Sequence, residues 1–164
     1  MLTDTLCTRC GLCCDGTLLG DVELTGPAEA ARLEILGLDV DTDDADAELM
    51  ALPCAGLRGT RCSVYAHRPQ CCRTFECRLL QNAQCGATTV DGALARIAEA
   101  QAQVEHVKAL LSKVEARPVR MPLAERVADA IASAASGPRA SRRAAELDAA
   151  MAALARTIRT TFLG

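Results

Sequence analysis

The chain has almost no aromatic residues: Trp is absent, Tyr occurs once and Phe twice among 164 residues. Large aromatic side chains usually contribute most to buried core area, so this core must rely on Leu, Val, Ile and Ala. In the N-terminal half even these residues are separated by Gly, Thr and Asp. Because a structural metal contributes on the order of 10 kcal/mol to the folding of small modules, we expect a metal to stabilise this half.

The sequence also lacks segments that would direct it into a membrane or out of the cell. No apolar run approaches the roughly 20 residues that span a bilayer. Residues 1–6 contain an aspartate but neither the basic nor the apolar region of a secretory signal peptide. We therefore expect a cytoplasmic protein without a membrane anchor, in which cysteines stay reduced and disulfide frameworks are rare.

Several catalytic signatures are missing as well. There is no Gly-rich nucleotide loop and no C-x-x-x-C-x-x-C motif of the common radical S-adenosylmethionine type. No pair of residues suited to acid–base catalysis stands out. The sequence therefore leaves open whether the protein is an enzyme.

Charge is divided unevenly along the chain. Residues 1–116 carry 10 Lys and Arg against 17 Asp and Glu, whereas residues 117–164 carry 8 against 4. The acidic excess is concentrated between Asp39 and Glu48, which predicts a solvated loop. The basic excess includes Arg139, Arg142 and Arg143, but it lacks the interleaved aromatic residues that stack on bases. We therefore do not expect nucleic-acid binding.

Cysteine is the residue type in excess. All ten cysteines lie in the first 85 residues, and four of them form the pattern C-x-x-C-G-x-C-C. Two-residue gaps let the backbone curl so that successive sulfurs converge, as tetrahedral zinc and iron–sulfur clusters both require. Gly11 suits a loop that approaches such a centre closely. The four are Cys7, Cys10, Cys13 and Cys14, and the others are Cys54, Cys62, Cys71, Cys72, Cys77 and Cys85.

The N-terminal half is expected to contain short elements around these cysteines. The first cluster is assigned to a loop, followed by a strand over 20–24 and a helix with Thr25 as N-cap, Pro27 in its first turn and Gly37 at its end. Residues 52–54 and 62–65 are predicted to pair as a β-hairpin with Gly59 in its turn. A helix starting at 67–72 is then expected to carry both Cys72 and Cys77.

The C-terminal half shows helical periodicity. Apolar residues recur at three-and-four spacing from Val90 to Val114, and further helices are expected over 123–135 and from about 138 onward. Residues 117–122 and 136–138 are read as the breaks between them. The last helix carries a stripe of Leu147, Met151, Leu154 and Ile158, which indicates a core or a dimer interface. The predicted fold is α+β, mostly α: a cysteine-rich metal-binding domain over 1–86 with a short β-hairpin, followed by an antiparallel helical bundle over 87–164.

An ordered series of motifs resembles the CxxCxxCC family of zinc- or iron-chelating proteins. The series is C-x-x-C-x-x-C-C, then Pro53-Cys54, then C-x-V-Y-x-x-R-P-x-x-C-R-x-F-x-C, and it covers roughly residues 7–80. The resemblance implies a bacterial cysteine-cluster protein whose relatives include flagellin lysine N-methylases. It marks Cys71 and Cys85 as additions. The metal ligands that it implies are Cys7, Cys10, Cys13, Cys14, Cys54, Cys62, Cys72 and Cys77.

The spacing of the first cysteines favours a [4Fe-4S] cluster. Cys7, Cys10 and Cys13 reproduce the double two-residue spacing with which ferredoxins hold three corners of such a cluster, the fourth ligand coming from elsewhere. Zinc is the alternative, although zinc sites more often combine two separate C-x-x-C knuckles. Adjacent side chains diverge, so Cys14 is expected to face the downstream cysteines, Cys77 among them. Two four-ligand sites and one cluster with spare thiols both stay open.

Residues beside the downstream cysteines are expected to support the metal. Arg68 and Arg73 would offset the negative charge of several thiolates and donate hydrogen bonds to sulfur. Tyr65, like Phe75, would shield the centre from water or simply pack beneath it. Neither histidine is expected among the ligands.

The predicted function is metal binding. A cysteine-ligated [4Fe-4S] cluster or zinc organises the N-terminal half, and the helical half recruits a protein partner or forms a homodimer. One alternative is an iron–sulfur-dependent enzyme or redox protein with methyl-transfer-like chemistry, which the flagellin methylase relatives suggest. The other is a metal-trafficking protein.

Overall fold

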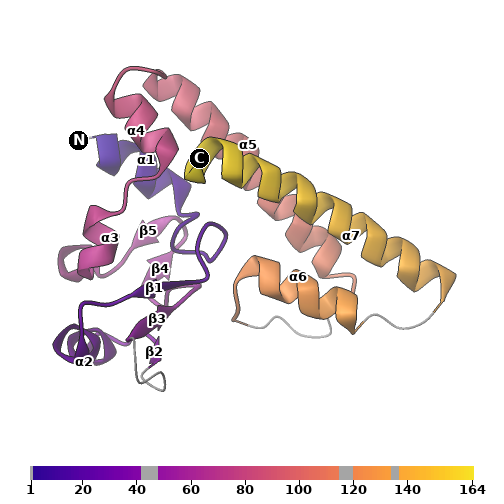
Figure 1. The fold of residues 1–164 in the computed structure, drawn as a ribbon, viewed down its shortest axis with the longest axis horizontal. Coiled ribbons are helices and arrows are strands. Elements are labelled where there is room, and N and C mark those ends of the chain that lie inside the picture. The colour runs from indigo at the N-terminus through magenta and orange to yellow at the C-terminus, as the bar shows by residue number, and fades with distance from the viewer. Residues whose placement is uncertain (1, 42–47, 115–119, 134–136) are drawn as a thin grey trace.

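A computed structural model describes residues 2–41, 48–114, 120–133 and 137–164. The short elements of the cysteine-rich part gather at one end, and the helices of the C-terminal half extend away from them (Figure 1). Most described residues are helical, and the strands form two small antiparallel sheets. The predicted α+β, mostly α class is confirmed.

Helix α1 (Leu2–Cys10) carries the first two cysteines, so the predicted loop is wrong for this segment. Asp4 lies in its first turn and Arg9 in its last, where each charge complements the helix dipole. Gly11 ends the helix with a φ of 72°, and a Cβ there would lie 3.1 Å from the Cα of Thr60. Gly11 therefore allows the turn that was expected, but the close neighbour is Thr60.

A three-stranded antiparallel sheet was only partly foreseen. Strand β1 (Asp21–Glu23) confirms the strand predicted over 20–24, and it pairs with β3 (Leu49–Ala51), which also pairs with β2 (Val40–Asp41). Met50 faces Val22 on one side and Val40 on the other. Asp41 was assigned to a solvated loop and lies in β2 instead, while Asp43, Asp44 and Asp46 lie outside the described residues.

Helix α2 (Pro27–Ile35) confirms the helix expected after β1, with Pro27 in its first turn. The N-cap is Gly26, not the predicted Thr25. Thr25 acts one residue earlier, because its backbone N–H and its hydroxyl both donate to the carboxylate of Glu29 at 3.0 Å. Gly37 closes the helix with a φ of 77°, as its position predicts.

The hairpin is present but shorter than predicted. Strand β4 (Leu57–Arg58) pairs with β5 (Arg61–Cys62) around Gly59, which adopts a φ of 60°. Cys54 precedes the hairpin, so the expectation of two cysteines on paired strands is wrong: Cys62 is in a strand and Cys54 is not. A short 3₁₀ helix, η1 (Tyr65–His67), follows.

The helix expected to carry both Cys72 and Cys77 is two helices. Helix α3 (Gln70–Thr74) holds Cys71 and Cys72, and Cys77 is the N-cap of helix α4 (Arg78–Gln84). The Thr74 hydroxyl donates to the carbonyl of Gln70 at 3.0 Å, and Phe75 turns into an extended conformation. The direction of the Cys77 side chain is therefore set by α4 and not by the helix that carries Cys72.

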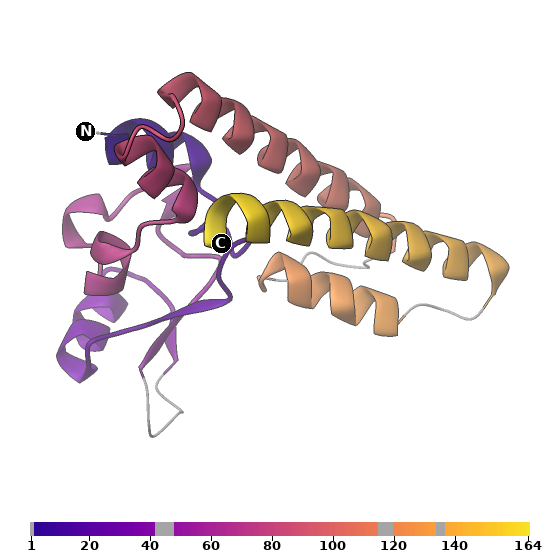
Figure 2. The same ribbon diagram turned by 45° about the horizontal axis from the view of Figure 1, so that its top comes forward.

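The C-terminal helices confirm the predicted antiparallel bundle. Helix α5 (Val90–Leu111) runs away from the cysteine-rich part, and α7 (Pro138–Thr157) returns beside it and ends in a π-helical stretch, η2 (Ile158–Leu163) (Figures 1 and 2). Helix α6 (Leu123–Ala132) packs against α7.

The predicted breaks between these helices are described only in part. Of the first break, 117–119 lie outside the described residues, as does Ser136 of the second. Gly137 and Pro138 begin α7, with the proline in its first turn. Among the described residues, no helix is long and apolar enough to cross a membrane.

Two separate hydrophobic clusters hold the molecule together. The larger, here the helical core, joins α1 and α4 to α5, α6, α7 and η2 and includes Leu147, Leu154 and Ile158. Most of the apolar stripe that was predicted on the last helix is therefore buried in the core of this chain. The smaller, here the small core, lies between α2 and the three-stranded sheet and consists of Leu24, Ala30, Leu33, Leu38, Met50 and Leu52.

Candidate metal centre

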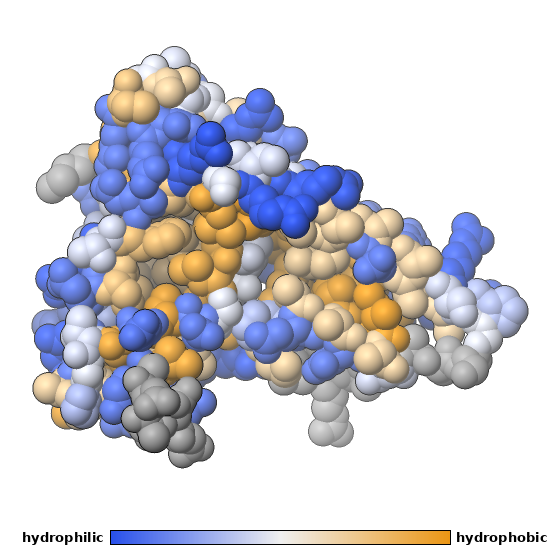
Figure 3. All heavy atoms as spheres, viewed as in Figure 1, coloured by the Kyte–Doolittle hydropathy of each residue, from blue (hydrophilic) through white to orange (hydrophobic). Residues whose placement is uncertain are grey.

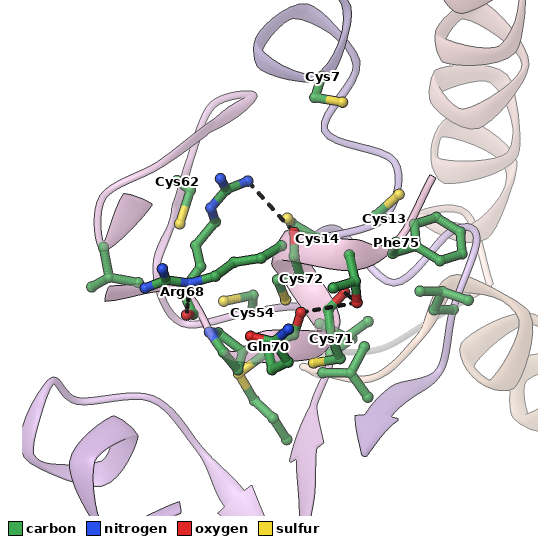
Figure 4. A pocket seen from close by; sticks show the side chains of 18 of the residues that line it. Cys7, Cys13, Cys14, Cys54, Cys62, Arg68, Gln70, Cys71, Cys72 and Phe75 are labelled. Carbon is green, nitrogen blue, oxygen red and sulfur yellow. Dashed lines mark hydrogen bonds between the residues drawn. The ribbon is translucent and has the colours of Figure 1, made fainter. Parts of the chain in front are cut away.

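Most of the cysteines line one cavity. Its volume is ≈ 910 Å³, and it opens between β1, the loop after α1, the hairpin and α3 (Figure 4). Figure 3 shows apolar residues gathered at the centre of the view, between the cysteine-rich part and the long helices. The cysteines that line the cavity are Cys7, Cys13, Cys14, Cys54, Cys62, Cys71, Cys72 and Cys77.

A second, much smaller cavity adjoins the first. Its volume is ≈ 70 Å³, and Cys10 lines it together with Cys7, Cys13, Cys14 and Cys77. Apolar side chains of the helical core, among them Phe162, close its other side. Cys85 lines neither cavity; it is exposed at the end of α4.

All ten cysteines are free thiols. Within the described ranges, no three Cys, His, Asp or Glu side chains already form a group able to hold a metal ion. The thiols are instead spread around the cavity walls. The donor set suits zinc or an iron–sulfur cluster, since both take thiolate ligands, but rotation of several side chains is needed to bring the sulfurs together.

Packing separates the cysteines into two sets. Cys10, Cys13 and Cys77 pack against the helical core, whereas Cys54, Cys71 and Cys72 pack against the small core. Cys77 was grouped by sequence with the downstream cysteines, but it lies on the side of Cys10 and Cys13. Cys77 lies on that side because the chain breaks between α3 and α4, which turns Cys77 away from α3.

The pKa shifts of the thiols follow the same division. Burial, together with the nearby thiols of Cys77 and Cys7, raises the pKa of Cys10 to about 12, although the Leu12 N–H opposes the shift. Burial also raises the pKa of Cys13, with Cys10 and Cys77 as its strongest thiol neighbours. For Cys14, burial raises the pKa to about 11, and the main thiol neighbours are Cys54 and Cys62.

These shifts mean that the buried thiols hold their protons at neutral pH. A metal binds the thiolate form, so binding displaces protons and strengthens as pH rises. Burial also raises the pKa of Cys7 and Cys54. In Cys54 this effect is opposed by the Gly56 N–H, which donates to its sulfur at 3.3 Å.

Two hydrogen bonds to backbone carbonyls tie the cysteine segments together. The Cys54 N–H donates to the carbonyl of Cys14 at 2.7 Å, which joins the first loop to the segment before the hairpin. The Thr60 hydroxyl donates to the carbonyl of Thr8 at 2.7 Å, which joins the hairpin turn to α1. The first cluster and the downstream cysteines therefore form one structural unit.

Cys71 was set aside as an addition, yet it lies in the cavity wall beside Cys72. The Cys72 thiol donates a hydrogen bond to the Cys71 sulfur, which lowers the pKa of Cys71 and raises that of Cys72. The signal available in the sequence was its position directly before Cys72.

The predicted supporting residues also lie at the cavity. The Arg68 guanidinium stacks over the Tyr65 ring, 3.7 Å from its centroid, and the Tyr65 hydroxyl donates to Asp4 at 2.8 Å. Arg73 donates to the carbonyls of Arg68 and Ala66. The hydrogen bonds found for both arginines end on backbone carbonyls and not on sulfur, while Tyr65 and Phe75 line the cavity and are each 39% exposed.

Comparison with known proteins gives one result. The model of the CxxCxxCC family, described as a putative zinc- or iron-chelating domain, matches residues 6–106, which is more than half of the chain. The chain belongs to the CxxCxxCC family. No curated protein and no solved structure matches it.

All ten cysteines of this CxxCxxCC protein lie within the matched residues. The match ends inside α5, so α6 and α7 lie beyond it. The family and the free thiols around a shared cavity together support metal binding.

Proposed function

We propose that the protein binds metal through two groups of four thiols. The first group is Cys7, Cys10, Cys13 and Cys77, and we assign a [4Fe-4S] cluster to it. The second group is Cys14, Cys54, Cys62 and Cys72, with Cys71 hydrogen-bonded to Cys72 at its edge. When bound, the cluster supplies one-electron chemistry or structural cross-linking.

The observation that carries this proposal is the position of Cys77. It packs with Cys10 and Cys13 against the helical core and shares the small cavity with them and Cys7. Cys77 therefore provides the fourth thiol that the C-x-x-C-x-x-C spacing requires from elsewhere. Cys14 is left to the second group, where its carbonyl already accepts the Cys54 N–H.

The preference for a cluster over zinc rests on spacing and room. The double two-residue spacing is that of cluster-binding ferredoxins. A tetrahedral zinc ion needs four sulfurs within about 2.3 Å of one point, whereas the thiols lie around a cavity of ≈ 910 Å³. Zinc in both groups is the alternative.

The test is anaerobic purification followed by metal and sulfide analysis and an absorption spectrum. About four irons and four acid-labile sulfides per chain, in brown protein, support the cluster assigned to the first group, and metal beyond these four irons supports filling of the second. Zinc without sulfide in protein purified in this way contradicts the cluster. Protection of the thiols from alkylation, mapped by mass spectrometry, then identifies the ligands. In the Cys77→Ser variant we expect protection to be lost at Cys7, Cys10 and Cys13; loss at Cys54 and Cys62 instead would contradict the grouping.

The cavity favours a second candidate, an iron–sulfur-dependent enzyme or redox protein. Its walls include apolar residues of β1 and β3 beyond the thiols, among them Val22 and Met50, which gives room for an organic substrate. A structure of the loaded protein with an open metal coordination position supports an enzyme, and a cluster with a cysteine ligand on each of its irons contradicts it. Metal trafficking predicts instead that a chelator exchanges the metal easily. A protein partner or homodimer through the C-terminal helices stays a prediction.

A further inference from the structure

Two polar side chains of the C-terminal half donate hydrogen bonds to the backbone that carries the cysteines. The first is Gln101, half-buried in the middle of α5. Its side-chain amide donates to the carbonyls of Arg9 at 2.8 Å and of Cys10 at 2.9 Å. These are the last carbonyls of α1, which have no partner within their own helix. Gln101 therefore fixes the backbone at the second cysteine of the first group.

The second is Arg120, in the segment that leads into α6. Its Nε and one Nη donate to the carbonyl of Pro53 at 3.1 and 2.9 Å, while its other Nη pairs with Asp39. The Pro53 carbonyl belongs to the peptide bond that leads to Cys54. The guanidinium thus holds the backbone directly before a cysteine of the second group, and its positive charge also acts on the Cys54 thiol.

The backbone is closely packed around this contact. A Cβ at Gly16, where φ is 78°, would lie 3.2 Å from the Cα of Pro122 and 3.4 Å from the nitrogen of Pro53. Three segments therefore meet without room for a side chain: the loop after Cys14, the segment before Cys54 and the start of α6. The Cys54 N–H bond to the Cys14 carbonyl joins the first two.

We propose that Gln101 and Arg120 are positioning residues for the metal-binding thiols, Gln101 for the first group and Arg120 for the second. This inference rests on the proposed function, since it needs two groups of ligands. Each residue acts through backbone carbonyls next to a cysteine. Arg120 lies outside residues 6–106, so the family match gives no indication of its role.

The test uses the full-length, metal-loaded protein and the alkylation rate of each cysteine, mapped by mass spectrometry. Gln101→Glu keeps the size of the side chain but removes both N–H donors. We expect it to increase alkylation of Cys7, Cys10, Cys13 and Cys77 about 10-fold or more, since lost supporting contacts typically cost 10–100-fold in metal affinity. The second group should change less than about twofold.

Arg120→Gln is the reciprocal variant. It should increase alkylation of Cys14, Cys54, Cys62 and Cys72 to a similar extent and leave the first group within about twofold. Arg120→Lys, which keeps the charge but loses the fork of donors, should fall between Arg120→Gln and the unchanged protein. Asp39→Asn is the matched control, because it removes the ion pair but keeps both bonds to Pro53.

Three results would overturn the inference. One is an equal effect of each variant on both groups, and another is no effect on either. The third is the same change in metal-free protein, which would show general loosening of the fold. Failure of the proposed function can be told apart from failure of this inference. In that case, the protein without substitutions already protects only one group of thiols from alkylation, or neither.

Discussion

The two hydrophobic clusters differ threefold in size although they belong to one chain. Among the residues that the structure describes, the helical core contains eighteen buried residues and the small core six. Because hydrophobic stabilisation grows with the apolar surface that is buried, the helical core contributes most of it. The sheet and α2 have little. Metal ligation by the surrounding cysteines is the interaction available to make up the difference.

Metal removal should have the largest effect on the difference in stability between the small core and the helical core. We expect stripping of the metal to expose the backbone amides of β1, β3 and α2, since apparent binding energies of structural metals reach on the order of 10 kcal/mol. Amides of α5 and α7 should keep most of their protection. Hydrogen exchange followed by mass spectrometry measures both regions at once. Equal loss of protection in the two regions would contradict the comparison.

A matched pair of substitutions, one in each core, tests which core depends on the metal. Leu33 in the small core and Leu154 in the helical core are both fully buried, with 0% exposure. Each change to Ala should destabilise the metal-loaded protein by about 2–5 kcal/mol. Leu33→Ala should in addition weaken metal retention against a chelator, and Leu154→Ala should not. Denaturant unfolding and chelator competition give the two readouts; identical retention in both variants counts against the dependence on metal.

Alkaline pH should destabilise the metal-free protein. Folding raises the pKa of Cys10 from 9.0 to about 12 and that of Cys14 to about 11. Between pH 9 and these values the folded protein keeps protons that the unfolded chain releases. Stability should therefore fall as pH rises, by about 1.4 kcal/mol per pH unit for each thiol. Denaturant midpoints measured from pH 8 to 11 check this, and loaded protein, whose ligands carry no protons, should vary less.

The smallest effect is expected at Cys85. It is exposed and lies outside both cavities, so Cys85→Ser should change stability by less than about 0.5 kcal/mol. Metal content per chain should stay the same. Loss of metal in this variant would mean that the ligand set extends beyond the cavities.

The sequence predicts the parts of the fold that carry local signals. Pro27 and Gly37 mark the ends of α2, and the spacing of apolar residues from Val90 onward gives α5. Strand β3 has only three residues, and its pairing with β1 joins segments far apart in the chain. No local pattern reports such a pairing. Helix α1 was missed because Leu6 is its one buried residue, although Asp4, Arg9 and Gly11 were available as end signals.

The candidate site shows the same limit. The cysteine spacing identifies which residues can bind metal, but their grouping depends on tertiary structure. Cys77 joins Cys10 and Cys13 because Phe75 interrupts the helix, and Cys71 enters the cavity wall through its neighbour in α3. Gln101 and Arg120 contact the cysteine segments from 91 and 67 residues away in the chain. Such distances leave no pattern in a single sequence.

Cys13 and Cys14 are neighbours in the chain, and this adjacency is expected to couple metal binding by the two groups. Their Cα atoms are separated by one peptide bond, about 3.8 Å, although we assign the side chains to different groups. Filling the first group fixes this peptide and with it the Cys14 carbonyl that holds Cys54. The ordering cost of the second group is then already met, which makes uptake cooperative. We expect this coupling to be modest, so that each group can still lose its metal separately while a filled first group makes filling of the second easier.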